Sequence, residues 1–324
     1  MSFSKDVKEE LAKQINPARH CRIAETAAFI IFSGEYFYEN YGESYVKVST
    51  ENLTVGMKYF ILLEKTFRIR PEVTVRSNHG VYSYQIIVKD AEDVWQILKS
   101  IKVINDDGEL ISNSDMVNGI VVQNTCCKRA FLRGAFMTAG SITDPNKSYQ
   151  FEIAAGSESR AEGIMSMLSA FGIESKHTIR KRSHIVYIKE SSQIADILNI
   201  MEAHVALMNL ENVRILKEIR NSVNRKVNCE AANITKTTEA SYRQQQDIIY
   251  IRDNMGFGNL SEQLREIAAM RIEHSDASLK ELGMMLHPPL GKSGVNHRLR
   301  KLSEIANELR RQKEETHVNK ENQH

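Results

Sequence analysis

Apolar and polar positions in the first two thirds of the chain follow an order that occurs twice. Each copy begins with a mostly apolar helix (22–33 and 128–139) that ends at a glycine, a common residue at helix C-termini. A short strand, a second strand, an amphipathic helix, a two-stranded hairpin and a last helix are then predicted. Their ranges are 35–39, 45–50, 52–66, 73–77 with 82–88, and 91–101 in the first copy, and about 142, 149–154, 158–171, 176–180 with 184–188, and 191–201 in the second.

The two copies also match residue by residue. Val88–Leu98 aligns with Ile188–Leu198 at a shift of 100 residues, and Cys21–Gly34 aligns with Cys127–Gly140 at a shift of 106. Such repetition predicts one pseudo-symmetric α+β domain over residues 19–203. Its repeats are expected at about 19–103 and 125–203, after an N-terminal arm or helix at 1–18. A chance alternation of helices and strands is the alternative.

Beyond Met201 the chain becomes helical and increasingly polar. Apolar residues keep three-to-four spacing as far as Ile219, and the rest of 204–253 is predicted to be a polar and basic linker helix. Residues 254–311 then predict an all-α domain of three helices, and the polar tail 312–324 is expected to be disordered. The predicted N-caps of these three helices are Ser261, Ser278 (a capping box with Glu281) and Ser293.

The last two of these helices have the pattern of a helix-turn-helix, because Pro288 and Pro289 interrupt them and the second is basic at its start. Val295, Leu299 and Leu302 should face the core of the domain. Asparagine and arginine make paired hydrogen bonds to base edges, and lysine and serine at a helix N-terminus suit phosphates. A three-helix bundle with a solvated basic face is the alternative. The residues expected to face a DNA groove are Lys292, Ser293, Asn296, His297, Arg300 and Lys301.

Charge distribution points to the same partner. The 324-residue chain has a net charge of only +2, yet seven Lys/Arg face three Glu between Arg214 and Arg243, and seven face two between Lys292 and Lys313. This asymmetry points to a polyanion as the partner, and solvated helix faces are the alternative. Together with the helix-turn-helix pattern it predicts double-stranded DNA, and no pattern predicts a small-molecule substrate. Candidate phosphate contacts on the linker are Arg220, Arg225, Lys226 and Lys236.

The sequence predicts a cytoplasmic, nucleoid-associated protein. Its longest apolar run, Ala27–Phe32, has six residues, whereas a membrane helix needs about 20. The charged N-terminus lacks the apolar segment of a signal peptide.

Neither a metal nor another cofactor is predicted. The cysteines, at 21, 126, 127 and 229, form a poor disulfide framework and lack the usual zinc-binding spacings. His20 and Cys21 with Cys126 and Cys127 suggest a metal site only weakly, because adjacent cysteines rarely chelate one ion well. Buried thiols that pack the apolar helices are predicted instead.

The second apolar helix resembles a known motif. Leu132–Ser141 is similar to the LAGLIDADG motif of homing endonucleases, in which two paired helices each bring an acidic residue to catalytic metal ions just before the final glycine. The matching positions here are Ser33 and Ala139, neither of which ligates metal as a carboxylate does. The resemblance therefore implies the scaffold without the catalytic site, and no enzyme activity. The alternative is a metal-dependent endonuclease that uses Glu35 or Asp144.

Four longer blocks resemble the bacterial WhiA family, and together they extend over nearly the whole chain. They are Met1–Leu11, Cys126–Phe136, Arg220–Asn233 and Pro288–Leu302. The resemblance implies a degenerate LAGLIDADG domain, a linker and a C-terminal helix-turn-helix in a non-catalytic, sequence-specific DNA-binding regulator. The family is linked to sporulation-gene transcription, cell division and chromosome segregation. A third possibility is an interaction scaffold, whose first domain binds a regulatory protein and whose last domain alone touches DNA.

Overall fold

The structure is a computed structural model that describes residues 2–39, 42–78, 80–111 and 116–321. The chain divides into two compact units, unit 1 (Met1–Glu218) and unit 2 (Ile219–His324). None of the helices in these described ranges is both long and apolar enough to cross a membrane.

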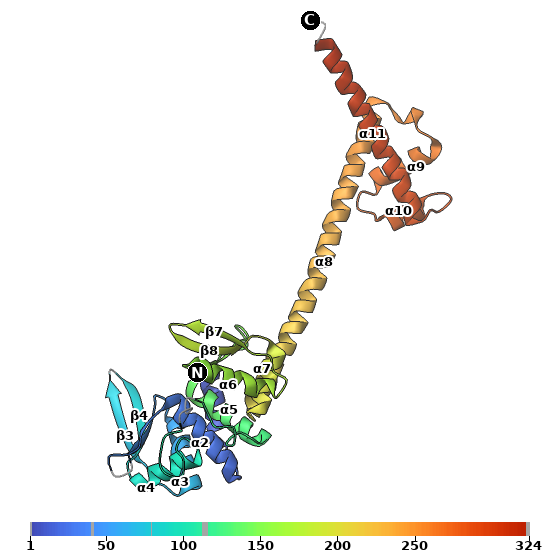
Figure 1. Cartoon of the computed structure of the whole chain (residues 1–324). Coiled ribbons are helices and arrows are strands. Elements are labelled where there is room, and N and C mark those ends of the chain that lie inside the picture. Colours follow the sequence, from blue (N-terminus) through green and yellow to red (C-terminus); the bar gives the residue numbers. More distant parts are fainter. Residues whose placement is uncertain (1, 40–41, 79, 112–115, 322–324) are drawn as a thin grey trace. The chain divides into compact units, whose positions relative to one another are not determined.

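Unit 1 contains the two predicted copies, preceded by helix α1 (Phe3–Lys13) (Figure 1). The first copy consists of α2 (Arg19–Ser33), β1 (Gly34–Phe37), β2 (Tyr45–Thr50), α3 (Leu53–Phe67), β3 (Glu72–Asn78), β4 (Val81–Val88) and α4 (Ala91–Ser100). The second consists of α5 (Thr125–Ala139), β5 (Gly140–Ile142), β6 (Phe151–Ala154), α6 (Glu158–Ser169), β7 (Lys176–Arg180), β8 (Ser183–Ile188) and α7 (Ser191–Ile200). The predicted element order is confirmed in both copies.

Each copy forms a four-stranded antiparallel sheet with the same topology. The strand orders are β1-β2-β4-β3 and β5-β6-β8-β7, so the hairpin strands β3 and β7 form one edge of their sheets. The pair Val48 and Ile86 in the first sheet corresponds to Ile153 and Val186 in the second, and all four side chains are buried. Because the two sheets bury equivalent positions, the predicted pseudo-symmetry is confirmed.

Helices α2 and α5 lie side by side at the centre of unit 1 (Figure 1). Their apolar residues, including Phe29, Ile30 and Phe131, are buried. A Cβ atom added at Gly134 would lie 2.8 Å from both the Ala28 Cβ atom and the Glu25 carbonyl oxygen. The small residues of the two motifs therefore allow a close approach of the two backbones.

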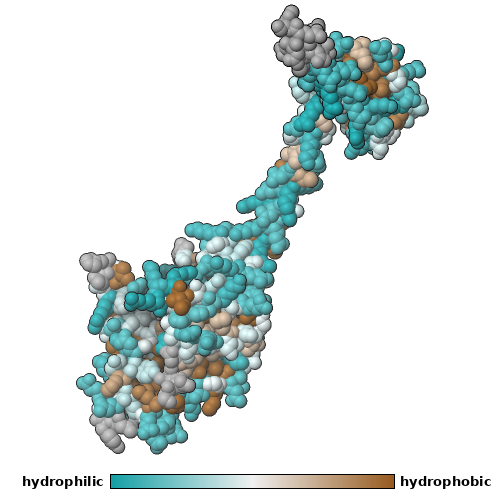
Figure 2. All heavy atoms as spheres, turned by 45° about the horizontal axis from the view of Figure 1, so that its top comes forward, coloured by the Kyte–Doolittle hydropathy of each residue, from teal (hydrophilic) through white to brown (hydrophobic). Residues whose placement is uncertain are grey.

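Helix α8 (His204–Asn254) begins in unit 1 and ends in unit 2. The Glu10 carboxylate of α1 accepts hydrogen bonds from the backbone amides of Val205 and Ala206, at 2.8 and 3.0 Å, and so satisfies two free donors at the start of α8. The Lys217 ammonium donates to the Pro145 carbonyl at 2.6 Å. Beyond this point residues 218–240 are all exposed. Figure 2 shows hydrophilic residues over most of this stretch, with a few apolar side chains between them.

Unit 2 packs three helices against the end of α8. They are α9 (Glu262–Glu273), α10 (Leu279–Met285) and α11 (Lys292–Glu321), and a short 3-10 helix (Phe257–Asn259) precedes them. The buried core of the unit comprises Ile248, Ile251, Leu260, Leu264, Ile267, Ala268, Leu282, Leu286, Val295, Leu299, Leu302 and Ala306.

Two details of unit 2 differ from the sequence prediction. Helix α11 begins at Lys292, so Ser293 lies in its first turn and is not its N-cap. The same helix continues to Glu321, so residues 312–321 are helical rather than disordered. Two contacts with α8 hold α11 as far as Lys313: Arg310 pairs with Asp247 at 2.8 Å, and Lys313 donates to the Asn254 side chain at 2.8 Å. The last three residues of the predicted tail lie outside the described residues.

Candidate nucleic-acid interface

Helix α11 separates its apolar side from its polar side as predicted. Val295, Leu299 and Leu302 are at most 1% exposed and face the core of unit 2. The six predicted groove residues are all exposed, in two neighbouring rows with a spacing of four. One row is Lys292, Asn296 and Arg300, and the other is Ser293, His297 and Lys301.

Two arginines of α11, Arg298 and Arg300, lie in different surroundings. Arg298 is only 14% exposed and its guanidinium lies 3.7 Å from the Glu266 carboxylate of α9, so it helps to hold the two helices together. Arg300 is 78% exposed, and its Nε atom lies 3.2 Å from Glu304 one turn later. An exposed pair of this kind is weak, so Arg300 is available to a partner.

The capping box predicted at the start of α10 is confirmed. The Ser278 hydroxyl accepts from the Glu281 amide at 3.3 Å, and the Glu281 carboxylate accepts from the Ser278 amide at 2.7 Å. The preceding turn is held by buried Arg271, which donates to the Ala277 carbonyl at 2.7 Å. Burial lowers the pKa of Arg271. These contacts fix where α10 begins.

Two glycines lie against the turn between α10 and α11. The Leu290 amide donates to the Gly283 carbonyl at 2.8 Å, which draws the turn onto α10. A Cβ atom at Gly283 would lie 2.0 Å from the Leu290 carbonyl oxygen, and one at Gly294 would lie 1.9 Å from the Leu290 Cδ2 atom. The added Cβ atom would therefore meet backbone at Gly283 but only the end of a flexible side chain at Gly294.

Replacement of Gly283 with alanine should therefore destabilise unit 2 by about 1–3 kcal/mol, the usual range for overpacking. Gly294→Ala is the matched control. It should change stability by less than about 1 kcal/mol, because Leu290 can change rotamer and alanine favours the helix. Thermal unfolding followed by circular dichroism measures both variants. Trp95, the one tryptophan of the chain, lies in unit 1, and its fluorescence should be unaffected. Equal losses for the two variants would contradict this account of the turn.

The candidate phosphate contacts on α8 are exposed but do not form one cluster. At 100° per residue, Arg225 and Lys236 share a side of the helix about 16 Å apart, whereas Arg220 and Lys226 lie on other sides. None of the four has an ion-pair partner within the described part of the chain. They present separate cations along the helix.

The positions that match the LAGLIDADG carboxylates lie at the C-terminal ends of α2 and α5. The Ser33 hydroxyl donates to the Phe29 carbonyl at 2.9 Å, and Ala139 has no polar side-chain atom. The acidic residues nearby are already engaged. Glu35 lies 2.5 Å from the Lys47 ammonium, and Asp144 accepts from the Asn146 amide at 2.9 Å, which lowers the pKa of Asp144.

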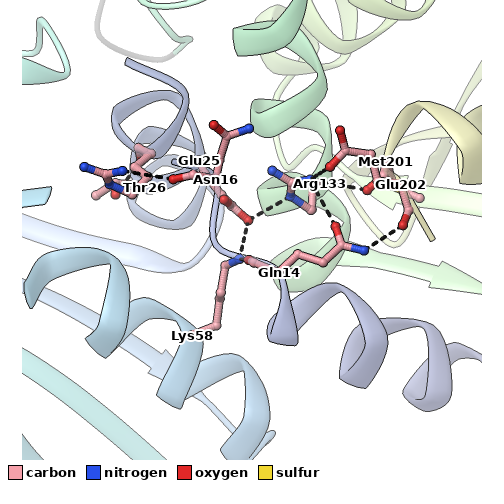
Figure 3. Close-up of polar contacts among 9 residues, drawn as sticks. Gln14, Asn16, Glu25, Thr26, Lys58, Arg133, Met201 and Glu202 are labelled. Atoms are coloured by element: carbon pink, nitrogen blue, oxygen red, sulfur yellow. Dashed lines mark hydrogen bonds and ion pairs between the residues drawn. The ribbon is translucent and has the colours of Figure 1, made fainter. Parts of the chain in front are cut away.

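A buried ionic network lies between α2 and α5 and was not predicted (Figure 3). The Glu25 carboxylate, which is fully buried, has the Lys58 ammonium and Arg133 Nε each at 3.1 Å. Arg133 also contacts Glu202 at 2.7 Å and Gln14 at 3.3 Å. The pKa of Lys58 is lowered, mainly because its ammonium group is buried. The available signal was a charged residue inside the apolar part of each helix, Glu25 in the first and Arg133 in the second.

The structure brings together His20, Cys21, Cys126 and Cys127, which the sequence analysis considered and set aside. Burial of the thiols is confirmed for Cys21 and Cys127 but is wrong for Cys126, which is exposed. Cys229 is exposed on α8.

Comparisons with known proteins find similarity to a single family along nearly the whole chain. Three family models match: the WhiA N-terminal LAGLIDADG-like domain at residues 19–104, the WhiA LAGLIDADG-like domain at 128–220, and the WhiA C-terminal HTH domain at 223–306. A protein of Lachnoclostridium phytofermentans named probable cell division protein WhiA is 51% identical over 96% of this chain and 100% of its own length. The protein of that name in Lachnospira eligens is 46% identical over 96% and 98%. The crystal structure of full-length DUF199/WhiA from Thermotoga maritima is 25% identical, with a TM-score of 0.59 over 95% of this chain and 99% of that one.

Proposed function

Because the chain belongs to the WhiA family, we propose that it is a non-catalytic, sequence-specific DNA-binding protein that regulates transcription, cell division or chromosome segregation. Its relatives carry the name of cell division proteins, and its C-terminal region matches a helix-turn-helix domain of that family. The proposal places the protein at the nucleoid, where its partner, double-stranded DNA, lies.

The arrangement of α11 is the observation that carries this proposal. A helix that reads the major groove needs one face anchored in its own domain and another that is free, polar and about two turns long. Val295 and Leu299 are anchored, whereas Asn296 and Arg300 are exposed one turn apart, with Lys292 one turn earlier. Asparagine can pair with adenine and arginine with guanine, and Lys292 is placed to contact a phosphate at the helix start.

The sheets of unit 1 are mixed in charge, because Lys47 lies beside Glu35, Lys89 beside Glu72, and Arg180 beside Glu152. We assign the main DNA contact to unit 2, which carries the exposed polar and basic face of α11. A protein partner for unit 1 is the second role that an observation favours. The edge strand β3 exposes Val73 and Val75, each by more than half, and an edge strand with apolar side chains suits a second chain.

The absence of nuclease activity is part of the proposal. A LAGLIDADG-type nuclease needs carboxylates that converge on divalent metal ions at the helix ends. Glu35 and Asp144 are engaged by Lys47 and Asn146, and within the described residues neither belongs to a group of three or more metal-ligating side chains. Supercoiled plasmid incubated with the pure chain and magnesium or manganese should stay intact. Cleavage that Glu35→Gln abolishes would overturn the proposal.

Salt dependence tests the role of α8. If Arg225 and Lys226 neutralise phosphates, their joint replacement with alanine should reduce the slope of log affinity against log salt by up to about 2, at about 0.9 per contact. Sequence preference should not change. The control is the Lys181→Ala, Arg182→Ala double variant, which removes two exposed cations from unit 1 and should leave the slope unaltered. Fluorescence anisotropy at several salt concentrations measures both. An unchanged slope for the α8 variant would remove this part of α8 from the DNA interface.

A further inference from the structure

The N-terminal ends of the two central helices carry a second group of side chains with its own chemistry. His20 and Cys21 lie in the first turn of α2, and Cys126 and Cys127 lie in the first turn of α5. The shift of 106 residues that relates the repeats aligns Cys21 with Cys127 and His20 with Cys126. Each repeat therefore contributes two potential metal ligands from equivalent positions.

The four ligand atoms lie close enough to share one ion. One atom of each side chain can be chosen so that all four lie within 4.8 Å of one another. The His20 Nδ1 atom lies 3.1 Å from the Cys127 Sγ atom and 3.4 Å from the Cys21 Sγ atom. In a tetrahedral zinc site with Zn–S bonds of about 2.3 Å, ligand atoms are about 3.8 Å apart. Small rotations of the four side chains would bring their ligand atoms to these tetrahedral distances.

The tertiary structure removes the objection that adjacent cysteines chelate poorly. Neither dipeptide has to surround an ion alone, because the close packing of α2 against α5 brings the second pair of ligands from 106 residues away. Cys21 and Cys127 approach from the buried side, whereas His20 and Cys126 lie on the exposed side. Cys126 also lines a surface hollow of about 260 Å³.

Burial and the neighbouring cysteines raise the pKa of Cys21 and Cys127, so a bound ion would have to stabilise their thiolates. The two helix N-termini assist it, because both helices begin without a side-chain cap and without an acidic residue in the first turn. Three thiolates and one imidazole make a Cys₃His set, which is typical of closed structural zinc sites.

We propose that His20, Cys21, Cys126 and Cys127 bind one structural zinc ion that joins the two repeats of unit 1. The ion would lie at the opposite end of α2 from Ser33, about 20 Å away at 1.5 Å per residue. It would thus stabilise the helix pair at the end remote from the lost nuclease site. Because all four ligands come from the protein, no position is open for a reacting water, which excludes a catalytic role for the ion.

Metal analysis of the full chain tests the proposal. Protein purified with a reductant and without chelator should contain about one zinc per chain, as measured by inductively coupled plasma mass spectrometry. Cys21→Ser and Cys127→Ser should lose it, whereas Cys229→Ser, the matched control on α8, should keep it. Retention of zinc by both cluster variants, or its loss from Cys229→Ser, would overturn the site.

A spectroscopic readout keeps the test valid if a buried cysteine variant does not fold. The zinc-free full chain titrated with cobalt should develop the thiolate charge-transfer band and the strong visible bands of tetrahedral cobalt. His20→Ala changes an exposed side chain, so it should fold, and it should shift this spectrum and release the metal at lower chelator concentration. An unchanged spectrum for His20→Ala would overturn the four-ligand assignment. Reduced full-length chain that binds neither zinc nor cobalt, or a Cys21–Cys127 disulfide under reducing conditions, would overturn the proposal as a whole.

Discussion

Replacement of Glu25 with glutamine should lower the free energy of unfolding of unit 1 by about 3–5 kcal/mol, the range for breaking a buried ion pair. The Glu25 carboxylate is the acceptor that Lys58 and Arg133 share, and all three side chains are almost completely buried. Glutamine keeps the shape but removes the negative charge. Lys58 would then lose its buried counter-ion and would have to release its proton or stay charged in a dry interior, since Glu202, the other carboxylate of the network, is 40% exposed. Arg133 retains Glu202, so most of the cost arises at Lys58.

A double-mutant cycle identifies this cause. Lys58→Met removes the stranded cation, so Glu25→Gln combined with Lys58→Met should be more stable than Glu25→Gln alone, with a coupling energy of about 1–3 kcal/mol. Urea unfolding followed by Trp95 fluorescence measures all three variants, because Trp95 lies in α4 of unit 1. Losses that simply add would show that Glu25 and Lys58 act independently and would contradict the network as described.

Replacement of Arg300 with alanine should weaken specific DNA binding by about ten- to a hundredfold, consistent with 1–3 kcal/mol for a bidentate base contact. Among the described residues Arg300 pairs with Glu304, and this pair is exposed and weak, so the DNA contact costs little to form. Preference should relax at one position of the site. Lys292→Ala should instead weaken binding to all sequences equally, because a phosphate contact carries no sequence information.

The control for this pair is Glu304→Gln, which frees Arg300 without shortening it and should not weaken binding. Anisotropy titrations against a specific and a scrambled duplex measure affinity and preference together, and thermal melting confirms that each variant is folded. Unchanged specific affinity in a folded Arg300→Ala variant would show that α11 does not read bases through this residue.

The sequence predicted most of the fold because local patterns and repetition agreed. Strand β2 was predicted with its exact bounds, Ser278 with Glu281 formed the expected capping box, and Val295 and Leu299 were assigned to the core. Helix ends were less accurate. Ser293 is a good N-cap residue, but the turn at Leu290 and Gly283 lets α11 begin earlier.

The interactions that the sequence did not predict all join distant parts of the chain. Glu25 and Arg133 are 108 residues apart, and only the close approach of α2 and α5 makes them partners. The same packing assembles His20 and Cys21 with the two adjacent cysteines of α5. The contacts of Arg310 and Lys313 with α8 join residues more than 50 positions apart. Periodicity reports which face of a helix is buried, but not which residue lies opposite.

The proposed function requires that this chain reads DNA sequence through α11 and does not cut it. The most direct measurement is selection from a random duplex library by the full chain in the presence of magnesium, with sequencing of the bound fragments. We expect intact fragments that share one motif to be enriched. A triple variant with alanine at Lys292, Asn296 and Arg300 should enrich none, while thermal melting by circular dichroism shows that its unit 2 is still folded. Enrichment of the same motif by the triple variant, or recovery of cleaved fragments, would contradict the proposed function.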